Sequence, residues 1–210
     1  MKNNVLIVGG SGFLGQNIIE NHLYNVNTSK IYVYGNFDRT HAFFDPQKKI
    51  ILLGPYSHNE KLSFLENISV IYYLIGGLYT NKSNNIDENK KNLLCFKNKI
   101  SNDKIKTIFI YFSSAGGIYK NSKLINTEDS PTSPSNDYER SKLNLESYLN
   151  LISNDYFKTI IVRPSNIYGR FQEIRRNQNG IITTLIYNYL TDNTTYMPEN
   201  YKLIYRDYLH

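Results

Sequence analysis

A tyrosine and a lysine four residues apart are the first pair in this sequence suited to proton transfer. This spacing occurs twice, at Tyr119/Lys123 and at Tyr138/Lys142. Tyr119 precedes polar loop residues, whereas Tyr138 stands just inside a predicted helix, after the candidate capping residues Ser135–Asp137. Because residues four apart share one face of a helix, Tyr138 and Lys142 can point at the same substrate. We therefore assign the catalytic role to the second pair.

A glycine-rich turn near the N-terminus is the second feature with chemical meaning. Residues 9–15 are Gly-Gly-Ser-Gly-Phe-Leu-Gly, between the first predicted strand and the first predicted helix. Gly9 would permit the tight turn, and Gly12 would let a pyrophosphate approach the backbone at the positive end of the helix. Gly15 would allow the helix to pack closely on the strand. This arrangement predicts a dinucleotide-binding site.

The end of the second predicted strand bears on the choice between NAD and NADP. An acidic residue usually stands there to bind the adenosine ribose of NAD, but this sequence has Gly35. Asp38 in the following loop would replace that acid, or Arg39 would hold the 2′-phosphate of NADP. Both residues can also be ordinary loop charges. The choice stays open, with NAD taken first.

The catalytic tyrosine has to release its proton near neutral pH. A free tyrosine has a pKa near ~10. The Lys142 ammonium and an oxidised nicotinamide would both favour the phenolate of Tyr138. We therefore expect Tyr138 to give or take a proton near neutral pH.

The elements that position these residues alternate between short apolar strands and amphipathic helices. The pattern predicts an α/β fold with a Rossmann-like, doubly wound parallel sheet. Strands are expected at Val5–Val8, Ile31–Tyr34, Ile50–Leu53, Val70–Ile75, Ile105–Phe112 and Thr159–Val162. Helices are expected near 13–24, 59–66, 84–100, 136–154 and 179–190.

Length and composition limit the class of protein. The chain has 210 residues and 40% hydrophobic residues, enough for one core and part of a second. Its single cysteine excludes an internal disulfide framework and fits a reducing compartment. No apolar run approaches the ~20 residues of a membrane span, and the N-terminus lacks the pattern of a signal peptide. We expect a cytoplasmic protein that does not interact with membranes.

The mild positive charge of the chain would also suit a small anionic ligand. The formal net charge is +6, but the lysines are scattered and form no basic stripe, so we expect no nucleic-acid partner. The four histidines show no spacing typical of metal ligands, and no metal site is predicted.

Six short motifs in a fixed order resemble the extended short-chain dehydrogenase/reductase family, especially NAD-dependent epimerases/dehydratases of the UDP-glucose 4-epimerase type. They are VGGSGFLG at 8–15, VIYYLIGG at 70–77, FSSAGGIY at 112–119, YERSK at 138–142, RPSNIYG at 163–169 and RDYLH at 206–210.

The resemblance implies roles for residues within these motifs. Tyr138, Lys142 and Ser114 would be catalytic. Asn166 and Arg206 would bind the substrate. The cofactor would contact Gly9, Gly12, Phe13, Leu14, Gly15, Asn36, Arg39, Leu74, Ile75, Gly76, Asn89, Ser113, Tyr138, Lys142 and Ser165.

The sequence departs from the family pattern at several positions. Ala115 stands where a Ser or Thr usually bonds the reacting hydroxyl, so Ser113 or Ser114 would have to reach the site. Pro55 replaces an acid on the adenine side. Gly116 and Gly117 replace the Asp-Glu pair of dehydratases, which argues against dehydration and leaves epimerisation or 4-keto reduction.

The resemblance implies an NAD(P)-dependent nucleotide-sugar epimerase that oxidises the sugar transiently at C4. The alternatives are a nucleotide-sugar 4-keto reductase and a non-catalytic dinucleotide-binding remnant. Surface polysaccharide synthesis is the implied pathway.

The implied organisation is a cofactor domain followed by part of a substrate lobe. Residues 1–165 would form the NAD(P)-binding domain, and 166–210 would begin a substrate-binding lobe that is incomplete in a C-terminally truncated chain. The partner would be a nucleotide sugar. A homodimer would form through the helices near 84–100 and 136–154.

Overall fold

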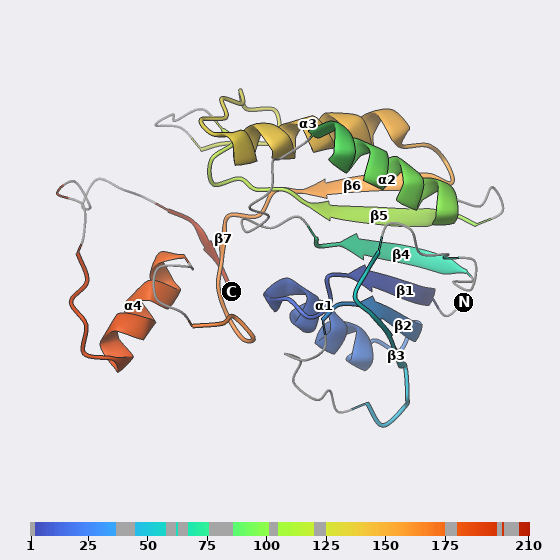
Figure 1. The fold of residues 1–210 in the computed structure, drawn as a ribbon, viewed down its shortest axis with the longest axis horizontal. Coiled ribbons are helices and arrows are strands. Elements are labelled where there is room, and N and C mark those ends of the chain that lie inside the picture. Colours follow the sequence, from blue (N-terminus) through green and yellow to red (C-terminus); the bar gives the residue numbers. More distant parts are fainter. Residues whose placement is uncertain are drawn as a thin grey trace.

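The computed structural model describes residues 3–36, 45–57, 62, 67–75, 86–100, 105–119, 125–174, 180–196, 199 and 206–210, with only the backbone for 86–89. Six parallel strands form one sheet in the order β3-β2-β1-β4-β5-β6 (Figure 1). This order is typical of the Rossmann fold, so the predicted fold class is confirmed. The strands are β1 Asn3–Val8, β2 Thr28–Tyr34, β3 Ile50–Gly54, β4 Ile68–Tyr73, β5 Thr107–Phe112 and β6 Phe157–Val162.

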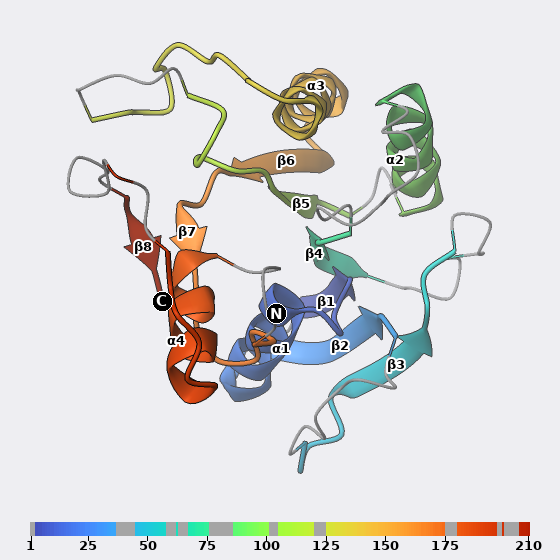
Figure 2. The same ribbon diagram turned by 60° about the vertical axis from the view of Figure 1, so that its left-hand side comes forward.

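Helices cover both faces of this sheet. Helix α1 (Phe13–Tyr24) lies on one face, while α2 (Ile86–Ile100) and α3 (Asp137–Ile152) lie side by side on the other (Figure 2). Successive residues of a strand point to opposite faces, so β1 contributes to two cores. Val5 and Ile7 pack with α1, whereas Leu6 and Val8 belong to the cluster shared with α2 and α3. All four are fully buried, which explains the uninterrupted apolar run of this strand.

Helix α3 starts at the position that its sequence predicts. Asn136 is the N-cap, and its side-chain oxygen accepts a hydrogen bond from the Glu139 backbone N–H at 2.9 Å. The Glu139 carboxylate in turn accepts hydrogen bonds from the Asn136 side chain and from the Ser135 backbone N–H. This reciprocal pattern is a capping box, and it holds the first turn of α3 in place.

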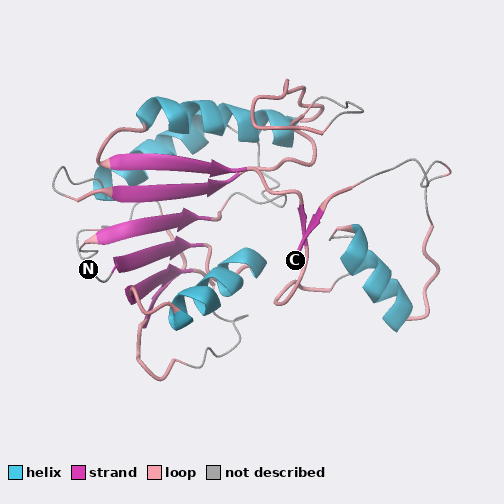
Figure 3. Cartoon of the chain, turned by 180° about the vertical axis from the view of Figure 1, so that it is seen from behind, coloured by secondary structure: helices cyan, strands magenta, loops and turns pink. Residues whose placement is uncertain are grey.

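A second, very small sheet lies beyond the carboxyl ends of the main strands (Figure 3). Strand β7 (Asn166–Ile167) pairs in parallel with β8 (Tyr208–Leu209), and α4 (Ile181–Leu190) lies between them in the sequence. This pairing is not predictable from the sequence, because neither two-residue strand carries a periodic pattern. The division of the chain after residue 165 stays a prediction.

The remaining expected elements agree closely with those observed. The five strands after β1 and the helices α1–α4 occur within a few residues of their expected positions. The helix expected near 59–66 lies outside the described residues, apart from Leu62. Among the helices that the structure describes, none is long and apolar enough to cross a bilayer.

The ring of Phe96 should be a main source of stability between α2 and the sheet. Phe96 is fully buried, with the rings of Tyr73 and Phe109 at 5.4 and 6.1 Å. We expect Phe96→Ala to lower the free energy of unfolding by about 3–5 kcal/mol, because it leaves a cavity in the core. Lys91→Ala, on the exposed side of α2, should change it by only about 0.5 kcal/mol. Urea unfolding of both variants measures the difference, and equal losses would contradict this account.

Candidate active site

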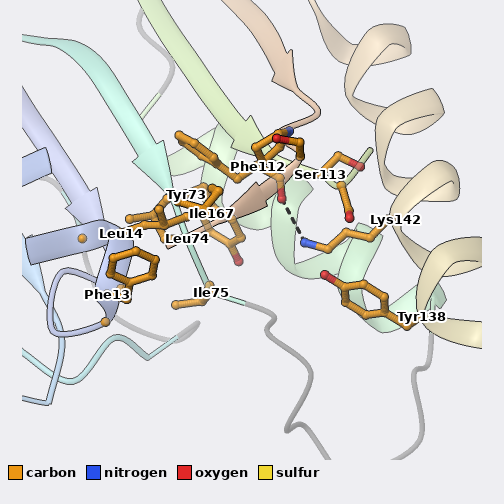
Figure 4. A pocket seen from close by; sticks show the side chains of 16 residues that line it. Phe13, Leu14, Tyr73, Leu74, Ile75, Phe112, Ser113, Tyr138, Lys142 and Ile167 are labelled. Carbon is orange, nitrogen blue, oxygen red and sulfur yellow. Dashed lines mark hydrogen bonds between the residues drawn. The ribbon is translucent and has the colours of Figure 1, made fainter. Parts of the chain in front are cut away.

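A cavity of about 340 Å³ lies at the carboxyl ends of β1, β4 and β5, where the glycine turn faces α3 (Figure 4). Twelve of its sixteen lining residues are among the site residues that the sequence predicts. They are Gly9, Gly12, Phe13, Leu14, Gly15, Leu74, Ile75, Ser113, Ser114, Tyr138, Lys142 and Ser165. The tertiary structure therefore brings together segments that are more than 150 positions apart in the sequence.

Four lining residues are not among the site residues that the sequence predicts: Tyr73, Phe112, Pro164 and Ile167. Each directly adjoins a predicted site residue, so its place next to a strand end or motif is the signal that could have found it. Three predicted cofactor residues cannot be placed. Arg39 and Gly76 lie outside the described residues, and for Asn89 only the helical backbone is described. Asp38, the alternative partner of the adenosine ribose, also lies outside the described residues.

The glycine turn has the tight geometry that its sequence predicts. Gly9 has a φ of +96°, a conformation that favours glycine, and its N–H and that of Gly10 donate to the Tyr34 carbonyl at 2.9 and 2.8 Å. A methyl group at Gly15 would lie 2.5 Å from the Gly9 carbonyl oxygen and from the Gly10 Cα. Only glycine at position 15 therefore allows α1 to begin this close to β1.

The start of α1 is suited to an anionic group. Gly12 is the N-cap, no side chain caps this end, and the first turn contains no acidic residue. The N–H groups of residues 13–15 therefore have no partner from the helix itself, and they lie at its positive end. Among the described residues, a methyl group at Gly12 would have only the Gly9 carbonyl oxygen within 4 Å, at 3.5 Å. This open cradle fits the pyrophosphate of a dinucleotide.

The end of β2 explains why Gly35 replaces the expected acid. A methyl group at Gly35 would lie 2.8 Å from the Ser11 backbone nitrogen and 2.9 Å from its Oγ. That Oγ also accepts a hydrogen bond from the Asn36 N–H at 3.0 Å. An acidic side chain at position 35 would displace the glycine turn. Asn36 lies beside Ser11 but outside the lining of the cavity, so its contact with the cofactor stays a prediction.

Tyr138 and Lys142 both reach the cavity from the first two turns of α3, and their polar ends point the same way (Figure 4). Lys142 is only 8% exposed, and its ammonium donates a hydrogen bond to the Phe112 carbonyl at 2.9 Å. The ammonium lies 5.5 Å from the centre of the Tyr138 ring and 4.8 Å from that of Tyr111. The arrangement therefore places a cation beside the phenol, as the spacing predicts.

The titration behaviour of the pair differs from the expectation. Burial raises the pKa of Tyr138 above its usual value of 10.0, instead of the Lys142 charge lowering it. Burial also lowers the pKa of Lys142 to about 8, although the Glu146 carboxylate partly offsets this effect. The protein residues by themselves therefore do not favour the phenolate, and the expectation that Lys142 and an oxidised nicotinamide together let Tyr138 exchange a proton near neutral pH stays a prediction.

The serine segment after β5 forms the wall next to Lys142. Ser113 is 6% exposed, and within the described part of the chain its buried Oγ has no hydrogen-bond partner. Such an orphaned hydroxyl in a cavity wall is free to bind a ligand or water. Ser114 also lines the cavity. The Ala115 N–H donates to the Pro164 carbonyl at 2.9 Å, which ties this segment to the chain leaving β6.

Gly117 has a packing role that the sequence does not reveal. A methyl group at this position would overlap the Glu139 carboxylate. The same carboxylate caps α3 through Ser135 and Asn136, and although desolvation acts against ionisation, these hydrogen bonds lower the pKa of Glu139. A residue with a side chain at 117 would therefore disturb the start of the helix that carries Tyr138.

The segment 163–172 crosses from β6 to α1 along the cavity. Its Ser165 and Ile167 line the cavity. At its far end, the Asn17 side chain donates to the Arg170 carbonyl at 2.8 Å, and Arg170 forms an ion pair with Glu20 at 2.6 Å. Two contacts with α1 therefore hold this segment in place.

The two predicted substrate residues lie together but outside the cavity lining. The Asn166 side chain donates to the Asp207 carbonyl at 3.0 Å, next to the exposed Arg206. The pairing of β7 with β8 brings them together from positions 40 apart in the sequence. Their contact with substrate stays a prediction. Among the described residues, no group of three or more His, Cys, Asp or Glu could hold a metal ion.

Comparisons with known proteins agree on the type of fold and on a nicotinamide dinucleotide. The model of the NAD dependent epimerase/dehydratase family matches residues 5–210. The dTDP-4-dehydro-6-deoxyglucose reductase of Escherichia coli is 30% identical over 203 residues, which cover 86% of this chain and 60% of the reductase. A decarboxylating sterol-4-alpha-carboxylate 3-dehydrogenase of Candida albicans is 28% identical over 182 residues, covering 79% of this chain and 51% of that enzyme.

Two solved structures are also similar. A UDP-N-acetylglucosamine 4-epimerase from Methanobrevibacter ruminantium, in complex with UDP-N-acetylmuramic acid, has a TM-score of 0.76 at 20% identity, covering 100% of this chain and 69% of its own. A UDP-glucuronic acid 4-epimerase from Bacillus cereus, in complex with UDP-glucuronic acid and NAD, has a TM-score of 0.69 at 21% identity, covering 90% and 64%. This chain spans between about half and 60% of the length of the two curated relatives.

Gly12 and Gly15 should respond differently to one added methyl group. We expect Gly12→Ala to fold normally and to weaken NAD binding about tenfold or more, because its methyl group blocks the pyrophosphate cradle. Gly15→Ala should lower the free energy of unfolding by about 1–3 kcal/mol, because its methyl group overlaps the turn backbone.

The matched control for Gly12→Ala is Gly180→Ala. Gly180 is also a helix N-cap, at α4, and a methyl group there would have no atom of the described part of the chain within 4 Å. This variant should keep both stability and NAD affinity. Calorimetric titration with NAD and urea unfolding measure the three variants. Wild-type affinity in Gly12→Ala would contradict the assigned pyrophosphate cradle.

Proposed function

This chain belongs to the NAD dependent epimerase/dehydratase family, and we propose that it is a nucleotide-sugar epimerase that oxidises its substrate transiently at C4. The observation that carries the proposal is the cavity in which the Tyr138–Lys142 pair faces the glycine cradle of α1. Gly117 supports epimerisation over dehydration, because the Glu139 carboxylate fills the space that an acidic side chain there would need.

When bound, the dinucleotide supplies a ring that accepts and returns hydride. Tyr138 takes the proton from the sugar hydroxyl and later returns one to the carbonyl oxygen. The Lys142 ammonium stabilises the negative charge on the Tyr138 oxygen and donates hydrogen bonds to the ribose next to the nicotinamide. Burial keeps the Tyr138 phenol protonated. Tyr138 therefore acts as a base only when a further positive charge lies close to its oxygen.

The serine hydroxyls complete the proposed reaction centre. Ala115 cannot bond the reacting hydroxyl, so Ser114 takes this role from the wall beside Lys142, and the orphaned Ser113 Oγ binds the cofactor. NAD is the proposed cofactor. The Bacillus cereus structure contains NAD, and the glycine cradle suits the pyrophosphate of either dinucleotide.

A 4-keto reductase is the second candidate. The Escherichia coli relative, at 30% identity, is named as a reductase of a dTDP-4-dehydro sugar. Both reactions use the same proton transfer through Tyr138, but only the reductase consumes reduced dinucleotide.

The proposal also covers the oligomeric state of the protein, its location, its domain organisation and its pathway. Helices α2 and α3 contact each other and expose Leu94 (41%) and Leu151 (80%), which suits the proposed homodimer through these helices. A cytoplasmic location, a substrate lobe beginning at residue 166 and a place in surface polysaccharide synthesis are also proposed.

Tyr138→Phe tests the proposed proton transfer. We expect turnover of UDP-sugars to fall about 10²–10⁴-fold, because phenylalanine cannot exchange a proton, while NAD affinity stays close to that of the unmodified chain. The matched control is Tyr156→Phe, an exposed tyrosine before β6 at the far end of the sheet, which should keep full turnover. Unchanged turnover in Tyr138→Phe would remove the residue from the mechanism.

The stoichiometry of reduced dinucleotide separates the two candidate reactions. Following NADH and NADPH absorbance during turnover, we expect no net consumption, because an epimerase regenerates its cofactor in each cycle. Consumption of one reduced dinucleotide per product would instead establish the reductase. If the chain binds NAD but neither binds nor converts UDP-sugars, it is the non-catalytic remnant.

A further inference from the structure

A buried ion pair lies directly behind the lysine of the candidate active site. Glu146 follows Lys142 by one turn of α3, on the same face, and its side chain is 4% exposed. Arg163, just after β6, donates to both of its carboxylate oxygens, with a shortest distance of 2.6 Å. The Glu146 carboxylate is thus fixed in one position behind the cavity wall.

Arg163 also links this pair to two further segments. Its guanidinium donates to the Tyr119 hydroxyl at 3.0 Å and to the Glu128 carbonyl at 3.3 Å, and it lies 5.2 Å from the centre of the Tyr119 ring. Arg163 is followed by Pro164 and Ser165, which line the cavity. The ion pair therefore connects α3 to both segments that form the cavity wall beside Lys142.

The charged and titratable groups around Lys142 come from three elements. Tyr138 and Glu146 face it from α3, Tyr111 faces it from β5, and Arg163 stands behind Glu146 at the end of β6. Burial lowers the pKa of Lys142 and also raises the pKa of Tyr111, which leaves that phenol neutral. The hydrogen bonds to Glu146 raise the pKa of Arg163, so this group stays cationic. Glu146 is then the one carboxylate beside Lys142 among the described groups.

We propose that Glu146 is a positioning residue, which keeps the Lys142 ammonium charged and directed at the Phe112 carbonyl so that it can serve Tyr138. This inference rests on the proposed function of the Tyr138–Lys142 pair. A carboxylate close to a buried ammonium favours its charged form. Arg163 holds that carboxylate in place, so the charge acts at a fixed distance.

A purely structural role for the ion pair makes a different prediction. If Glu146 only fastened α3 to the segment after β6, its replacement would change stability and leave the titration of Lys142 unchanged. Breaking a buried pair is costly in either case, because the remaining charge loses its partner. Stability alone therefore cannot decide, and the protonation of Lys142 has to be measured directly.

The test is an NMR titration of the chain labelled with ¹³C,¹⁵N-lysine, in which the Lys142 signal is identified by its loss in Lys142→Met. For the unmodified chain we expect a midpoint at about pH 8. In Glu146→Gln the midpoint should fall by about half a pH unit or more, because the neutral amide no longer favours the ammonium. NAD affinity, which needs the ammonium, should then begin to decline at a correspondingly lower pH.

The matched control is Glu20→Gln, which removes a helical glutamate paired with Arg170 at 2.6 Å on the other side of the cavity. Its Lys142 midpoint should stay at about pH 8. If Glu146→Gln does not fold, the double variant Glu146→Gln/Arg163→Met removes both charges at once and should show a fall in the same direction but a smaller one, because the Arg163 cation, which disfavours the Lys142 ammonium, is removed as well. An unchanged midpoint in the folded variant overturns the proposal.

This measurement is independent of the test of the proposed function. The NMR titration needs neither ligand nor turnover. If Tyr138→Phe keeps its turnover, the proposed function fails, and the Lys142 midpoint still reports whether Glu146 controls its charge. If turnover is lost as expected and the midpoint does not move, only the role of Glu146 fails.

Discussion

The contact between Gly15 and the Gly9 carbonyl sets the position of the first helix, and both sides of the cavity depend on it. With no side chain at Gly15, α1 begins directly at the carboxyl end of β1 and turns its free N–H groups toward the cavity. The same helix holds the segment that crosses from β6, through Asn17 and the ion pair of Glu20 with Arg170. A displaced α1 would therefore move the cofactor cradle and the opposite wall together.

Helix α3 provides the reactive side of the cavity through residues four positions apart. Tyr138, Lys142 and Glu146 lie on one face, from the cavity to the buried interior. An ammonium at this depth is costly unless polar groups replace its water, and here the Phe112 carbonyl accepts a hydrogen bond from it. One turn further along α3, Glu146 pairs with Arg163, and neither residue is among those that line the cavity.

Packing accounts for two of the departures from the family pattern. An acid at position 35 would collide with Ser11 of the glycine turn, and a side chain at 117 would collide with Glu139 of the α3 capping box. The sequence shows that these positions are glycines, but their neighbours come from 24 and 22 positions away in the chain. The reason for each glycine is therefore visible only once the fold is known. For Ala115, the structure shows a backbone hydrogen bond to Pro164 and no cause for the small side chain.

The sequence by itself determined the parallel sheet, its helices and most of the cavity lining. Uninterrupted apolar runs, the glycine turn and the α3 capping box are local signals, and each fixes an element within a few residues. The tertiary structure decided the features that depend on contacts between residues far apart in the sequence. Examples are the pairing of β7 with β8, the bond of the Asn166 side chain to Asp207, and the Glu146–Arg163 pair. It also decided the direction in which the Tyr138 pKa shifts, because burial depends on how the whole chain packs around a group and not on the residues beside it.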